Sequence, residues 1–237
     1  LAGGPPSADL TYVLPEAESA VSFALPLDLD KIRATLAKKS HHAFEKNNLE
    51  VNVDATKLSY KLARHLRQEG YRATGTLANN HYRQDVPDWQ KRLHPDISHR
   101  YIAVRSGVGS FGWSGNVGIK DYDASIILET VVTSAELEAT EPIPDSDSFC
   151  SKCKLCVASC PSGFFDKNRE ETVVLGGKTF THAARNSYAL CALVCAGFTG
   201  ISRDGKWSTW SRAESRYRRR PQKRNYTKSC RWRSANT

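Results

Sequence analysis

The segment "CSKCKLCVASCP", residues 150–161, contains four of the seven cysteines in the chain. Its spacing is C-x2-C-x2-C-x3-C followed by proline, the pattern of bacterial ferredoxins, whose thiolates ligate [4Fe–4S] clusters. Two-residue gaps allow one turn of chain to present three soft thiolates to three corners of a cluster. Zinc is the competing interpretation, but zinc sites usually place two C-x2-C pairs far apart. The run therefore predicts an iron–sulfur site.

These four thiols do not complete the ligand sets of two clusters. In two-cluster ferredoxins the fourth cysteine of such a run ligates the other cluster. Downstream, the segment "SYALCALVCAGFTG" adds two more cysteines at C-x3-C. By this logic the first cluster is held by Cys150, Cys153, Cys156 and Cys195. Cys160 and Cys191 are left for a possible second cluster, whose remaining ligands stay open among Cys230, His182 and Tyr188.

Composition and cysteine placement indicate the class of protein. The 237 residues are 40% hydrophobic and 25% charged, as in ordinary globular domains. No apolar run approaches the ~20 residues that span a bilayer, and the first residues lack the basic and apolar regions of a signal peptide. Six cysteines fall between residues 150 and 195, which favours metal ligands over a disulfide framework. We therefore expect a cytoplasmic protein with no membrane span.

The positive charge is concentrated at the C-terminus. Residues 201–237 contain 12 Lys and Arg against 2 Asp and Glu, a net charge of +10, whereas the whole chain carries +9. The first 200 residues therefore sum to −1. Such a basic tail is typical of a solvated segment; the alternative is a contact with RNA or another acidic partner.

Strand-like and helix-like segments alternate through the first 133 residues, which favours a layered α/β or α+β domain. We expect strands over residues 20–28, 71–77 and 124–133, the last rich in β-branched residues. We expect a helix from an Asp54 cap to Gly70, with leucines at positions 58, 62 and 66. Residues 79–96 are expected to be a loop. The acidic, proline-containing segment 134–148 is the preferred domain boundary.

The segment "SGVGSFGWSGNVGI", residues 106–119, is rich in glycine. It contains G-x-G-x-x-G, but no acidic residue follows about 20 positions later within a βαβ unit, so a dinucleotide site is not indicated. The glycines indicate that the backbone turns tightly or approaches a bulky group closely.

A family resemblance becomes specific at this point. The order of "HPDISHRYIAVRSGVGSFGWSGNVGI", the strand-like "SIILETVVT", the acidic linker and the cysteine run resembles the epoxyqueuosine reductase and reductive dehalogenase superfamily. The resemblance covers roughly residues 22–200. It implies an α+β fold with a nitroreductase-like α/β core over residues 1–140, a ferredoxin-like [4Fe–4S] module over residues 141–200, and a basic tail over residues 201–237.

The resemblance also implies a cofactor and an activity. A corrinoid such as cobalamin would lie against Gly107, Gly109, Gly112 and Gly115. A ferredoxin or flavodoxin would supply electrons, which pass through the clusters to cobalt and drive reductive cleavage of a C–O or C–halogen bond. Two alternatives stay open: a corrinoid-free electron-transfer or redox-sensing protein, and an RNA-binding protein with a structural cluster.

The chain departs from the family at the proton donor. Where the epoxyqueuosine reductases carry an aspartate shortly before the glycine segment, this chain has Leu93. The nearby candidates for the general acid are Asp96, His99 and Tyr101. Asp96 has a second interpretation, as the cap of a helix that begins with "ISHRYIAV".

Overall fold

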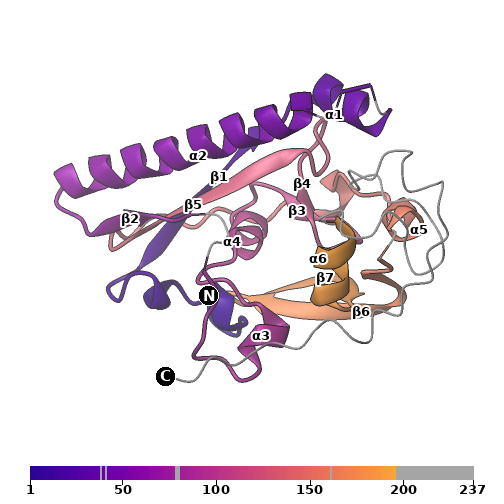
Figure 1. Ribbon diagram of the computed structural model, residues 1–237. Helices are drawn as coiled ribbons and strands as arrows, with labels where there is room; N and C mark the ends of the chain where they lie inside the picture. Colours follow the sequence, from indigo (N-terminus) through magenta and orange to yellow (C-terminus); the bar gives the residue numbers. More distant parts are fainter. Residues whose placement is uncertain (38, 41, 78–80, 161, 196–237) are drawn as a thin grey trace, which may run out of the picture.

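The computed structural model describes residues 1–195, except residues 38, 41, 78–80 and 161. Cys230, the basic tail and the side chain of Cys195 lie outside the described residues. The chain is a mixture of helices and antiparallel sheet, so the expected mixed fold is confirmed (Figure 1). Among the described helices, none is long and apolar enough to cross a membrane.

The central sheet has three antiparallel strands in the order β1-β5-β2. β1 spans Ser19–Pro26, β2 spans Ala73–Gly75 and β5 spans Ile126–Thr133. β5 lies in the middle, and its last residue Thr133 pairs with Ser19 on one side and Ala73 on the other. All three expected strands are present, each shorter than expected. β5 is central because its β-branched side chains are buried on both faces.

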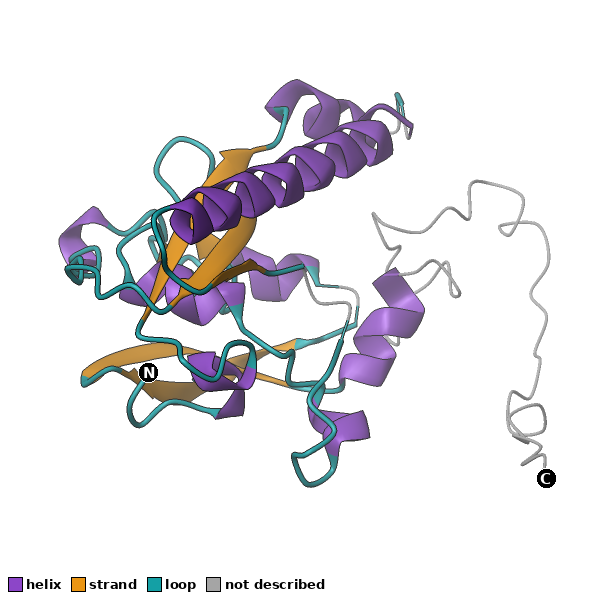
Figure 2. Cartoon of the chain, turned by 90° about the vertical axis from the view of Figure 1, so that its left-hand side faces the viewer, coloured by secondary structure: helices purple, strands orange, loops and turns teal. Residues whose placement is uncertain are grey.

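Helix α2, His42–Gln68, covers one face of the sheet (Figures 1 and 2). The expected start at Asp54 is wrong, since the helix begins at His42. Asp54 is exposed within it and pairs with Lys57 at 3.5 Å. Ala55, Ser59 and Ala63 face the sheet and are each 0% exposed. Leu62 and Leu66 of the expected stripe pack on the same cluster, whereas Leu58 is exposed. Small side chains at i, i+4 and i+8 allow the helix to approach the sheet closely, which the leucine pattern did not reveal.

Helix α4, His99–Arg105, covers the opposite face. Its Ile102 packs with Leu14, Ile97 and Val132 in the core between the helix and the sheet. The helix is capped by the Ser98 hydroxyl, which accepts a hydrogen bond from the backbone N–H of Tyr101 at 3.4 Å. The interpretation of Asp96 as the cap is therefore wrong.

The other elements connect and extend this core. They are the short helices η1 (Pro6–Ala8), η2 (Leu10–Tyr12), α1 (Leu29–Leu36), α3 (Trp89–Arg92), η3 (Asp145–Asp147) and α5 (Leu155–Ser159), the strand pairs β3–β4 (Ser110–Phe111 and Val117–Gly118) and β6–β7 (Phe165–Leu175 and Lys178–Arg185), and helix α6 (Tyr188–Cys195). Helix α3 lies within the segment that we expected to be entirely loop.

The β6–β7 hairpin follows the cysteine run in the sequence and precedes α6. Phe180 of β7 packs against the buried residues Ala103, Val104 and Val117, which belong to α4 and β4. The hairpin thus shares a hydrophobic core with the first part of the chain, although it lies within the predicted module 141–200. The domain limits themselves stay predictions.

Candidate active site

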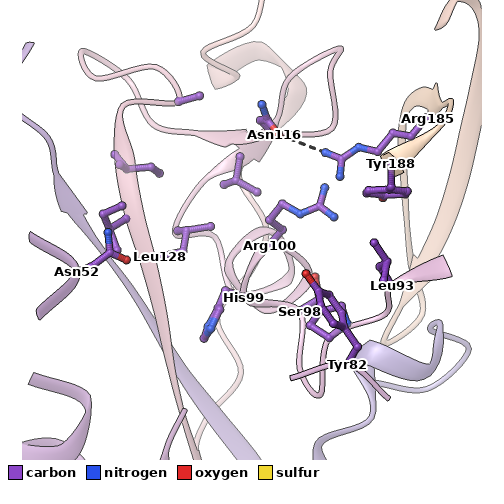
Figure 3. Close-up of a pocket in the computed structure, with 15 residues that line it drawn as sticks. Asn52, Tyr82, Leu93, Ser98, His99, Arg100, Asn116, Leu128, Arg185 and Tyr188 are labelled. Carbon is purple, nitrogen blue, oxygen red and sulfur yellow. Dashed lines mark hydrogen bonds between the residues drawn. The ribbon is translucent and has the colours of Figure 1, made fainter. Parts of the chain in front are cut away.

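A cavity of about 460 Å³ opens beside the sheet, between α2, α4, β5 and the start of α6 (Figure 3). Its apolar side is formed by Leu93, Pro95, Val117 and Ala124 together with residues 126–128 of β5. Its polar side chains are Asn52, Tyr82, Ser98, His99, Arg100, Asn116, Arg185 and Tyr188. Among the described residues that line it, none is Asp or Glu. The cavity is therefore a mixed apolar and polar site whose formal charge is positive.

Two arginines from distant parts of the chain meet at this cavity. Arg100 comes from the first turn of α4 and Arg185 from the last residue of β7. Arg100 donates a hydrogen bond to the Gly115 carbonyl at 2.7 Å, and Arg185 donates to the Ser114 carbonyl and the Asn116 amide oxygen, both at 3.2 Å. Burial, with the nearby charge of Arg185, lowers the pKa of Arg100 to about 10. Arg100 is therefore a largely buried cation with a second cation close to it.

His99 lines the cavity, but both of its ring nitrogens face protein atoms. Nδ1 lies 2.8 Å from the Thr130 hydroxyl and Nε2 lies 3.4 Å from the Leu77 carbonyl oxygen. Burial lowers the pKa of His99. The neutral ring then donates from Nε2 to Leu77 and accepts at Nδ1 from Thr130, because a carbonyl oxygen can only accept.

Glu129 is a residue of β5 whose buried side chain lies close to His99. Its side chain is 1% exposed, its Oε1 lies 3.9 Å from His99 Nε2, and this oxygen has no hydrogen-bond partner among the described residues. Burial raises the pKa of Glu129 to about 7. The Thr130 backbone N–H lowers the pKa in part, but burial outweighs it, so the carboxyl is held most favourably in its protonated form.

The three predicted general acids are not brought together. His99 lines the cavity, whereas Asp96 lines a smaller cavity of about 170 Å³ near β2. Tyr101 packs edge-on against Phe111, with ring centroids 6.2 Å apart, and burial raises the pKa of its hydroxyl. Leu93, which the resemblance places where an aspartate is expected, does line the cavity, with a left-handed φ of 49°. The site at this position is therefore apolar.

The four predicted corrin-contacting glycines pack against the protein itself. A side chain at Gly107 would meet the Glu141 carbonyl, and one at Gly112 would meet the Phe149 ring. At Gly109 the nearest atoms belong to strand β4 across the hairpin, and at Gly115 they belong to His182. None of the four lines the described cavity. Around these glycines the described residues form no open cradle for a flat ring, so the residues present do not fit a corrin there.

The cysteine run contacts the glycine segment. Cys150 Sγ accepts hydrogen bonds from the backbone N–H groups of Trp113, at 3.3 Å, and Lys152, at 3.4 Å. Cys160 Sγ accepts one from Phe164 N–H at 3.3 Å. Thiolates that bind iron–sulfur clusters accept hydrogen bonds of this kind, so Cys150 and Cys160 have N–H donors that suit a cluster ligand. Burial raises the pKa of the Cys156 thiol, and the neighbouring Cys150 and Cys153 raise it further.

The other predicted ligands lie in two elements. Cys191 is in α6, one turn after Tyr188, while His182 of β7 is buried beneath Gly115 and its Nδ1 donates to the Ala183 carbonyl at 2.9 Å. Within the described part of the chain, no group of three His, Cys, Asp or Glu side chains is arranged to hold a single metal ion. The ligand sets of the clusters stay predictions.

Sequence reasoning missed Arg100, Arg185 and Glu129. Glu129 carries a signal, because a lone carboxylate in the β-branched segment 124–133 is an acid in a strand that the pattern predicts to be buried. The arginines carry none, since they lie 85 positions apart among 34 Lys and Arg residues, and only the fold brings them together.

Comparison with known proteins gives one curated relative. The chain is 33% identical over 82 residues to epoxyqueuosine reductase from Synechocystis, a stretch that covers 33% of this chain and 27% of the relative. This match spans only about a quarter of the relative's length. No known family profile matches the chain.

Solved structures give matches to the same enzyme. An epoxyqueuosine reductase bound to an epoxyqueuosine-modified tRNA stem loop matches with 18% identity and a TM-score of 0.41, over 65% of this chain and 38% of that one. The Bacillus subtilis enzyme matches with 20% identity and a TM-score of 0.40, over 65% and 37%. The Streptococcus thermophilus enzyme matches with 16% identity and a TM-score of 0.39, over 71% and 40%.

Proposed function

We propose that this chain is part of an oxidoreductase that reduces a modified nucleoside in tRNA, with electrons that arrive through a thiolate-bound iron–sulfur cluster. The similarity over 82 residues to an epoxyqueuosine reductase supports the substrate class. The epoxide in that enzyme's name favours C–O cleavage over C–halogen cleavage. Removal of an epoxide oxygen as water consumes two electrons and two protons, so the site must deliver both.

One observation carries this proposal: two segments that border the cavity either contact or contain a cysteine. Trp113 N–H bonds Cys150 Sγ at 3.3 Å, and Asn116, three residues later, lines the cavity. On the other side, α6 carries both the cavity residue Tyr188 and Cys191. Residues at i and i+3 lie on the same side of a helix. A cluster on these thiols would therefore lie close to the cavity wall.

The cluster would be held by Cys150, Cys153, Cys156 and Cys195, and a second by Cys160 and Cys191 with further ligands. When bound, a [4Fe–4S] cluster supplies single electrons at a low potential, which the surrounding hydrogen bonds and burial adjust. Around Cys150 the chain supplies two N–H donors to the sulfur. A reduced ferredoxin or flavodoxin is the electron donor that we expect, in a cytoplasmic setting.

A corrinoid is a separate question, because the glycine segment does not offer the cradle that the resemblance implies. We therefore assign no step to a corrinoid. Corrinoid dependence, like the nitroreductase-like core, stays a prediction. Corrinoid dependence would be tested by looking for a corrin absorption band in the purified protein. Among the described cavity residues, the candidate proton donors are Tyr82 and Tyr188, because both ring nitrogens of His99 already contact protein atoms.

Anaerobic reconstitution tests the function. The full chain is loaded with iron and sulfide, its iron content and electron paramagnetic resonance spectrum are measured, and it is incubated with reduced flavodoxin and tRNA that carries an epoxide-containing nucleoside. Mass spectrometry of the digested tRNA is expected to show a loss of one oxygen, and the variant Cys153→Ser is expected to abolish it. A cluster-loaded protein that leaves the nucleoside unchanged, with and without added cobalamin, would overturn the proposal.

A further inference from the structure

We propose that Arg100 and Arg185 form a binding site for a phosphodiester group of the ligand that occupies the cavity. The identity of that ligand as RNA rests on the proposed function, but the anion site itself does not.

Two guanidinium groups meet here without a counter-charge. Among the described residues, no carboxylate forms an ion pair with Arg100 or Arg185, although Arg83 and Arg169 each pair with an aspartate. Glu171 is close enough to affect the pKa values of Tyr101 and His182, but it makes no ion pair with either arginine. Two neighbouring, partly buried positive charges repel each other, so an anion between them is favoured.

The pair also has donors to spare. A guanidinium has five N–H donors, and the described bonds of both arginines go to the three residues 114–116. Arg185 Nε is buried and has no hydrogen-bond partner among the described residues. The loop 114–116 thus holds both guanidinium groups in place while leaving donors available, and a fixed planar fork suits the oxygens of a phosphate.

The neighbouring wall matches a nucleotide better than a free anion. Tyr188 lies beside Arg185, and Tyr82 lies further along the wall, near Ser98 (Figure 3). Asn116, which also accepts from Arg185, contributes an amide (Figure 3). Aromatic rings that stack on bases, amides that read base edges and arginines that hold the backbone are the usual means of binding unpaired RNA. The volume of about 460 Å³ lies within the range for a small ligand.

The site is tested with two variants and with a control variant on α4, the helix that carries Arg100. Arg100→Gln and Arg185→Gln each remove one charge of the pair. Arg105→Gln is the control and removes an equal charge from α4. Arg105 does not line this cavity, and its side chain donates a hydrogen bond to the Thr140 carbonyl at 3.0 Å. Each protein is titrated with a short single-stranded RNA, with cobalamin and with cobinamide, which lacks the phosphodiester of cobalamin. Thermal unfolding is measured in phosphate and in chloride at equal ionic strength.

We expect phosphate to stabilise the wild type and Arg105→Gln but neither cavity variant. Binding of the RNA should weaken about tenfold to a hundredfold in each cavity variant, with a salt slope lower by about one. If cobalamin, and not cobinamide or RNA, shows this loss, the phosphodiester comes from a corrinoid; the anion site then stands and the RNA ligand fails. Equal phosphate effects and equal RNA affinities in all four proteins would overturn the anion site while leaving the proposed function intact.

Discussion

Replacement of Glu129 by glutamine tests the most perturbed carboxyl in the core. The side chain is 1% exposed, and burial raises its pKa from 4.5 to about 7. One pKa unit corresponds to 1.36 kcal/mol, so ionisation of Glu129 costs the folded state about 3 kcal/mol. Glutamine has nearly the same shape and cannot ionise, so Glu129→Gln removes that cost.

The sign of the effect follows from the raised pKa. Below about pH 4.5 the carboxyl is protonated in both folded and unfolded chains, so its stabilising contribution is fully present. As pH rises through about 7, the unfolded chain has already lost the proton and the wild type loses up to about 3 kcal/mol of stability. His99, whose pKa is lowered, works in the opposite direction, but it is present in both proteins and largely cancels in their difference.

The assay is urea unfolding of the wild type and Glu129→Gln from pH 5 to pH 8. The buried amide changes the unfolding free energy by about 1–3 kcal/mol at every pH. The test is therefore how the difference in unfolding free energy between the two proteins changes with pH. We expect the free energy of unfolding of the variant to increase relative to that of the wild type as pH rises, and the difference to become constant above about pH 7. The exposed Glu136→Gln is the control and should show no such trend. A difference that stays constant with pH, or grows as pH falls, would refute the reasoning.

Three further predictions concern the loop, the thiols and the cavity. Gly115→Ala should lower the free energy of unfolding in urea by about 2–4 kcal/mol, since φ is +69° and the new methyl would lie 2.9 Å from the His182 ring. The control Gly70→Ala, with φ of +92° and open space around it, should lower it by about 1 kcal/mol. Cys150→Ser should lower the iron bound per chain after reconstitution, whereas Ser159→Ala should leave it unchanged. Tyr188→Phe keeps the ring and removes the hydroxyl, so it should slow nucleoside reduction without weakening RNA binding; equal turnover would exclude the tyrosine as the proton source.

The sequence by itself determined the local features of this protein. Spacing identified the cysteine run, and β-branched residues identified the central strand β5, because both signals depend on neighbours along the chain. The resemblance also placed Leu93 where an aspartate is expected, and the structure puts that apolar side chain in the cavity wall.

Only the tertiary structure decided which distant residues meet. The sequence pattern also did not show that α2 packs on the sheet through Ala55, Ser59 and Ala63, because the burial of such small residues depends on the partner surface. The pairing of Arg100 with Arg185 required the β6–β7 hairpin to fold back against α4, a contact across 85 positions that no local pattern encodes. The glycines were recognised from sequence, but what they approach, the protein's own Glu141, Phe149 and His182, was set by packing. Local spacing fixes what chemistry a segment can perform, whereas burial and charge, which depend on the whole fold, decide where that chemistry is assembled.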